Sequence, residues 1–194
     1  ILMAATIISR VIGLLYRSPL GETIGNEGLG YYSTASNLYT ILLLISSYSI
    51  PMAVSKIVSE RLALKEYRNA HRVFHGALIY AVIVGGIAAL VAFFGGKFLL
   101  PYNQQNALLA LRVLAPIFFS AVLGVLRGYF QAHSTMMPTS ISQIIEQVFN
   151  AAFSIGAAWF FIQQFATNDT EHAKFGAAGG TLGTGAGVLA GLCF

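Results

Sequence analysis

Arg10 and Arg17 are the residues of this chain whose type and spacing most directly suggest a chemical function. Both lie in an otherwise apolar stretch, residues 1–20. Seven positions is almost two turns of an α-helix, so both side chains should project from one stripe, with Gly13 between them. An arginine is costly in a membrane and keeps its charge, so two on one stripe predict a water-filled cavity that binds anions. In the alternative, Arg17 marks the helix end and snorkels to the membrane interface.

A second polar stripe lies on a later apolar segment. Gln143, Glu146, Gln147 and Asn150 include pairs three and four positions apart, which places them on one face of a helix. A polar face of this width predicts the lining of a cavity, and we expect it to contribute to substrate binding together with the arginine stripe. Glu146 either holds a proton or cation that couples transport, or pairs with an arginine and locks its helix against a neighbour.

The elements that position these residues are predicted to be transmembrane helices. Hydrophobic residues make up 56% of the 194 residues and charged residues only 9%, whereas soluble proteins carry about 25% charged residues. Several uncharged runs reach the roughly 20 residues that cross a bilayer. We predict an all-α integral membrane protein with six transmembrane helices, at about residues 1–20, 31–54, 73–94, 107–130, 138–165 and 175–194. The chain has no start methionine and ends in an apolar run, so we expect it to be part of a longer protein.

The predicted breaks and kinks follow from polar and proline residues. The polar segments 21–28, 101–106 and 167–172 are expected to be turns. Pro51 and Pro116 fall inside predicted helices and are expected to kink them.

Lysines and arginines set the expected orientation. Six of them lie on one side of the predicted membrane: Lys56, Arg61, Lys65, Arg68, Arg72 and Arg127. The other side has only Lys97 and Lys174, so the positive-inside rule places the N-terminus in the cytoplasm. Segment 56–72 also has the pattern of an amphipathic helix along the headgroups. It either binds anionic lipids or is a linker that sets the topology.

Four glycines at four-residue spacing form a ridge in the last predicted helix: Gly179, Gly183, Gly187 and Gly191. Such a ridge predicts close packing against another helix in lipid, with a mobile hinge as the alternative. Neither this ridge nor Gly95-Gly96-Lys97 has the spacing of a nucleotide-binding loop. The four histidines show no metal-ligand spacing, and no nucleophile stands with a base. We therefore expect no metal or cofactor, no nucleic-acid partner and no enzymatic activity.

Several segments resemble one protein family. They are SRVIGLLYRSPL at 9–20, IGNEGLGYY at 24–32, IPMAVSKIVSER at 50–61, LRGYFQ at 126–131 and MPTSISQIIEQ at 137–147. Together they are similar to the stage V sporulation protein B and MurJ-like lipid II flippase family, in the polysaccharide exporter and multidrug extrusion superfamily. The resemblance implies two pseudo-symmetric, MATE-like lobes around a central cavity. This chain would be the N-terminal lobe, and the second lobe would lie outside it.

The resemblance also implies a function and a role for the first helix. Family members move a sugar precursor linked to undecaprenyl pyrophosphate, such as lipid II, across the bacterial plasma membrane by alternating access. Their first-helix arginines face the cavity, and Arg10 and Arg17 match those positions, although Gram-negative members space the pair one residue closer. Those members also carry an arginine in the second helix, where this chain offers Asn37, Tyr39 and Thr40.

The sequence thus predicts a flippase for cell-wall or polysaccharide biosynthesis. Its expected partners are a lipid-linked pyrophosphate substrate, membrane lipids and a coupling ion, H⁺ or Na⁺. Two alternatives stay open. One is a multidrug or cation antiporter of the same fold, which two deep arginines against one deep carboxylate disfavour. The other is a non-transporting membrane scaffold that uses the glycine ridge as an assembly face.

The predicted orientation can be tested by labelling single cysteines in cells, with Cys193 replaced by serine. A cysteine at Lys65 should react only with a membrane-permeant thiol reagent, because its loop is expected in the cytoplasm. A cysteine at Asn103 should react with an impermeant reagent as well. Labelling of position 65 from outside would contradict the predicted orientation.

Overall fold

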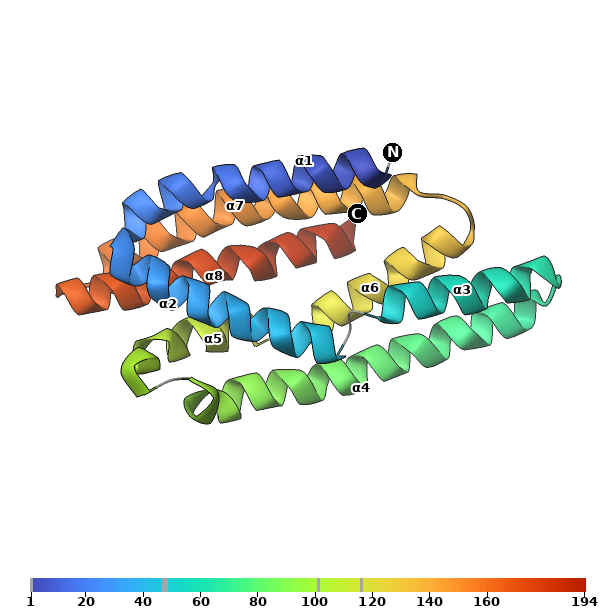
Figure 1. Cartoon of the computed structure of the whole chain (residues 1–194), viewed down its shortest axis with the longest axis horizontal. Helices are drawn as coiled ribbons and strands as arrows, with labels where there is room; N and C mark the ends of the chain where they lie inside the picture. Colours follow the sequence, from blue (N-terminus) through green and yellow to red (C-terminus); the bar gives the residue numbers. More distant parts are fainter. Residues whose placement is uncertain (1, 47–48, 101, 116) are drawn as a thin grey trace.

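The computed structural model describes residues 2–46, 49–100, 102–115 and 117–194, and this part of the chain is almost entirely helical, without strands (Figure 1). Its elements are α1 (Leu2–Leu15), α2 (Arg17–Ser46), α3 (Ile50–Ala63), α4 (Tyr67–Leu99), the 3₁₀ helix η1 (Tyr102–Ala107), α5 (Leu108–Leu114), α6 (Ile117–Ala132), α7 (Met137–Phe165) and α8 (Asp169–Cys193). The all-helical class predicted from the sequence is confirmed.

The helices pack in two groups. In one, α1 lies along α7, α7 lies along α8, and α2 and α5 pack on α8 (Figure 1). Leu20, Ile24, Leu111 and Ala177 are among the fully buried residues of its core. In the other group, α3, α4 and α6 pack around buried Val58 and their neighbours. The polar residues on α1 and α7 therefore belong to two directly adjacent helices.

The glycine ridge of α8 lies against α7. A Cβ atom added at Gly179 would stand 2.5 Å from the carbonyl oxygen of Ala157, and one at Gly183 would overlap the Ser154 side chain. At Gly187 an added Cβ would overlap the carbonyl oxygen of Glu146. These three positions thus need glycine for the observed helix separation. The ridge brings α8 onto the same turns of α7 that carry the polar stripe.

The fourth glycine and one hydrogen bond complete this seam. Gly191 is less constrained, because an added Cβ would make only ordinary contacts, the nearest being 3.4 Å from Leu123 Cδ2. The Ser154 hydroxyl donates to the carbonyl oxygen of Gly180 at 2.7 Å, which links the two helices directly.

The turn predicted over residues 21–28 is confined to Gly25, where two helical segments meet at a kink. Helix α2 runs through this segment, and only Gly25, with φ of 73° and ψ of 172°, leaves the helical conformation. Glycine adopts a positive φ without steric strain, so this one residue accommodates the change of direction. The first predicted helix ends earlier than expected, since α1 stops at Leu15.

Residues 31–54 and 107–130 are also divided differently from the prediction. Pro51 does not kink a helix but lies in the first turn of α3, where its missing N–H costs no hydrogen bond. Segments Tyr102–Leu114 and Ile117–Ala132 meet at an angle of 47°. The predicted kink at Pro116 falls on a residue outside the described ones.

The remaining helices are longer at their N-terminal ends than predicted. Helix α4 begins at Tyr67, and α8 begins at Asp169, inside the segment expected to be a turn. Segment 56–72 is not one amphipathic helix along the headgroups, because α3 and α4 form an antiparallel hairpin that turns at Leu64–Glu66. Glu66 accepts hydrogen bonds from Asn69 at 2.9 Å and from Arg61 at 3.0 Å across this turn.

Three helical stretches of the described residues are long and apolar enough to cross a membrane. They are Met3–Ala63, Tyr67–Leu99 and Met137–Phe165, and the bent pair Tyr102–Leu114 and Ile117–Ala132 gives a fourth if it is one span. Glycine-rich α8 is not among them, so the count of six crossings stays a prediction.

The glycine seam can be tested with two alanine variants of one helix. Gly183→Ala should destabilise the protein by about 1–3 kcal/mol, because its methyl group overlaps Ser154. Gly185→Ala is the matched control, since an added Cβ there meets nothing within 4 Å. Thermal unfolding in detergent measures both variants, and equal midpoints would contradict the role of the ridge.

Candidate functional site

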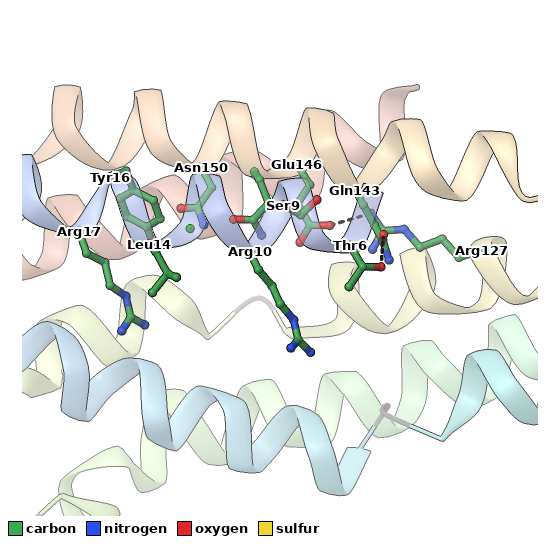
Figure 2. Close-up of a pocket in the computed structure, with 12 residues that line it drawn as sticks. Thr6, Ser9, Arg10, Leu14, Tyr16, Arg17, Arg127, Gln143, Glu146 and Asn150 are labelled. Atoms are coloured by element: carbon green, nitrogen blue, oxygen red, sulfur yellow. Dashed lines mark hydrogen bonds and ion pairs between the residues drawn. The ribbon is translucent and has the colours of Figure 1, made fainter. Parts of the chain in front are cut away.

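A polar cavity of about 580 Å³ lies between α1 and α7 (Figure 2). Its lining residues come from α1, the start of α2, α6 and α7: Thr6, Ser9, Arg10, Gly13, Leu14, Tyr16, Arg17, Arg127, Gln143, Glu146, Gln147 and Asn150. All six residues that the sequence singled out for substrate binding are in this set, namely Arg10, Gly13, Arg17, Gln143, Glu146 and Asn150. Their contact with a substrate remains a prediction.

Arg10 and Arg17 were predicted to lie on one uninterrupted helix. Instead, Arg10 lies on α1 and Arg17 begins α2, because the two helices are divided at Tyr16. Helical backbone bonds nevertheless cross this point. The Tyr16 amide donates to the Ile12 carbonyl, and the Leu20 amide donates to the Tyr16 carbonyl, both at 3.1 Å. The two arginine side chains consequently extend to the same side in Figure 2.

Both arginines are exposed and carry uncompensated charge. The ion pairs found among the described residues are Arg61–Glu66 and Arg127–Glu146, so neither Arg10 nor Arg17 has a carboxylate partner there. A guanidinium group without a partner keeps all its N–H donors available for an anion.

The α7 side of the cavity is held by specific hydrogen bonds. Thr6 donates to Gln143 Oε1 at 3.4 Å, which links α1 to α7. Asn150 is buried, and its side-chain amide lies 3.0 Å from the Ser154 hydroxyl oxygen. Gly13 stands opposite this wall, where an added Cβ would lie 3.6 Å from Gln147 Oε1.

Arg127 is the lining residue whose position the sequence analysis misplaced. It was counted among the charges on the cytoplasmic side of the membrane, but it lies on α6, and its side chain reaches α7. Its Nη2 lies 2.7 Å from Glu146 Oε2, and its Nε donates to the Ser142 hydroxyl at 2.9 Å. Of the two interpretations of Glu146, the structure shows the ion pair with an arginine. A charge inside an apolar helix needs such a partner, which is the signal that could have identified Arg127.

The charges that line the cavity favour an anion. Three arginines and one glutamate are among its lining residues, a net charge of +2. The Arg127 and Glu146 side chains are 18% and 21% exposed, so water screens this pair only in part. Positive charge focused in a concave site raises the local concentration of anions.

Comparison with known proteins places the chain in a family. Residues 1–192 match the family described as "Polysaccharide biosynthesis protein". The chain belongs to this family. Together with the apolar helices, this makes it a multi-pass membrane protein. No solved structure matches the chain.

Three proteins of Bacillus subtilis are similar to the chain. Stage V sporulation protein B is 28% identical over 201 residues, which cover 100% of this chain and 37% of that protein. Lipid II flippase MurJ is 26% identical over 85% of this chain and 32% of its own length. The uncharacterized membrane protein YabM is 24% identical over 94% and 34%. The chain thus spans about a third of the length of these relatives. The predicted resemblance is confirmed at the level of the family.

The sign of the cavity charge can be measured with thiol reagents on a cysteine at Leu14, an exposed lining residue, with Cys193 replaced by serine. An anionic methanethiosulfonate should react faster than a cationic one of similar size, by about tenfold or more. Replacing Arg10 and Arg17 with glutamine should abolish that preference. A cysteine that prefers the cationic reagent would show that the cavity does not attract anions.

Proposed function

We propose that the full-length protein is a flippase of the bacterial plasma membrane. It moves a lipid-linked sugar precursor that bears a pyrophosphate, such as lipid II, from the cytoplasmic to the outer leaflet by alternating access. The observation that carries the proposal is the pair Arg10 and Arg17, which line a polar cavity without carboxylate partners among the described residues. The similarity to lipid II flippase MurJ supports the same substrate class.

The chemistry of arginine suits this substrate. Pyrophosphate is a compact polyanion, and the forked guanidinium N–H groups match its oxygens in paired hydrogen bonds. Such contacts in a water-filled cavity offset part of the cost of moving the headgroup through the membrane. The polyprenyl chain stays in lipid, where it needs no protein cavity.

The transport cycle requires a second part of the protein. We propose that a second lobe follows and that rocking of the two lobes exposes the cavity first to one side and then to the other. The membrane potential or a gradient of H⁺ or Na⁺ drives the cycle. The precursor crosses unchanged, so this proposal includes no enzymatic step.

A cation antiporter of the same fold is supported less well. Such a protein needs a carboxylate that is available to a cationic substrate. Glu146 is the one acidic residue described in the cavity lining, and Arg127 already neutralises it.

The proposal is tested by complementation in bacteria depleted of their own flippase. Arg10→Ala in the full-length protein should abolish transfer of the lipid-linked precursor to the outer leaflet, while membrane insertion is retained. Arg10→Lys should restore transfer only in part, because an ammonium group keeps the charge but loses the forked geometry. Labelling of precursor in the outer leaflet measures the result.

Two further variants sharpen this test. Arg17→Ala should reduce transfer less, because Arg17 lies nearer the predicted membrane interface, where water screens its charge. Arg112→Gln is the matched control, since Arg112 lies over the Phe93 ring and does not line the cavity. If Arg10→Ala transfers the precursor as well as wild type at equal expression, the proposal is wrong.

A further inference from the structure

We propose that Arg127 is a third anion-binding residue of the cavity and that Glu146 is its resident counter-ion, which the phosphate groups of the substrate displace. The inference rests on the proposed function, because it assumes an anionic headgroup in this cavity. It assigns a specific contact to a residue on α6, a helix on which the sequence pattern identified no candidate binding residue.

The geometry presents Arg127 to the cavity in a fixed orientation. Its Nε is anchored on the Ser142 hydroxyl at 2.9 Å, and its Nη2 on Glu146 Oε2 at 2.7 Å. A guanidinium group carries five N–H donors, and these two contacts use one on Nε and one on Nη2. The others remain for a ligand, while Arg127 and Glu146 both border the same 580 Å³ space.

When the phosphate groups displace Glu146, both Arg127 and Glu146 still have polar surroundings. The Ser142 bond is made by a different nitrogen, Nε, so it holds Arg127 in place when the carboxylate moves away. Glu146 lines a cavity large enough for many water molecules and is 21% exposed. It can therefore be hydrated after it leaves Arg127, which avoids the large cost of a buried unpaired charge.

Pyrophosphate is the stronger partner for Arg127. It carries more negative charge than one carboxylate and offers more oxygens to the guanidinium donors. In the empty cavity Glu146 neutralises Arg127, which lowers the cost of a charge inside a membrane helix. The same carboxylate repels weak anions, so it selects for ligands of high charge.

A purely structural ion pair between α6 and α7 makes a different prediction. Removing either charge would then lower stability and leave ligand affinity unchanged. An affinity that increases in Glu146→Gln and decreases in Ser142→Ala, which changes no charge, is expected only if Arg127 contacts the ligand.

The experiment measures binding of a short-chain prenyl pyrophosphate to the purified full-length protein in nanodiscs, with the corresponding prenyl alcohol as the control ligand. Glu146→Gln should bind the pyrophosphate about tenfold more tightly than wild type, the size of one charge-assisted contact. The double variant Arg127→Gln with Glu146→Gln should lose that gain. Thermal unfolding verifies that each variant is folded.

Two more variants serve when the double variant is poorly folded. Ser142→Ala changes no charge but removes the hydrogen bond that orients Arg127. It should weaken pyrophosphate binding by about threefold, less than the loss of a full hydrogen bond would cause. Arg112→Gln, outside the cavity lining, should bind as wild type does.

The outcomes separate the two proposals. Wild-type affinity in Glu146→Gln and Ser142→Ala, together with loss of binding in Arg10→Ala, would overturn the role of Arg127 and leave the proposed function intact. A wild-type protein that binds pyrophosphate no better than alcohol would overturn both.

Discussion

The high cost of a charge inside a membrane is the constraint on which this architecture depends. Each arginine within an apolar helix needs either water or a partner of opposite charge. Arg10 and Arg17 have the first, since they are exposed on the cavity, and Arg127 has the second in Glu146. The cavity meets both needs: it gives Arg10 and Arg17 access to water, and it is lined by the Arg127–Glu146 ion pair.

The glycine seam between α7 and α8 fixes the position of this cavity wall. Gly183 and Gly187 contact the backbone turns of α7 that contain Asn150 and Glu146. On the other side, α1 packs along α7 and is joined to it by the Thr6–Gln143 hydrogen bond. Small residues far along the chain thus set the register in which α7 faces the arginines of α1.

Much of the site could be predicted from the sequence, because helical periodicity alone determines which residues share a face. The spacing of Arg10 and Arg17, and that of Gln143, Glu146 and Asn150, is enough to place them on two stripes, and the structure brings both stripes to one cavity. Periodicity does not reveal where a helix ends, because tertiary packing can extend the helical backbone hydrogen bonds beyond the periodic segment.

Two differences from the prediction have separate physical causes. The break in the polar, glycine-rich segment is limited to the kink at Gly25, so its other residues are helical where a longer turn was expected. Arg127 lies within a predicted helix and was counted among the cytoplasmic charges, whereas its side chain is part of the cavity wall. Its pairing with Glu146 depends on how α6 packs on α7, which no local pattern in the sequence specifies.

The central claim is that guanidinium groups of this cavity hold the anionic part of the substrate. Solid-state NMR can test it directly, by measuring dephasing of ³¹P in bound prenyl pyrophosphate by ¹⁵N-labelled arginine side chains of the full-length protein. The account predicts strong dephasing in wild type, reduced in Arg10→Lys and unchanged in Arg112→Gln. Bound ³¹P signals that show no dephasing by arginine nitrogen would contradict it.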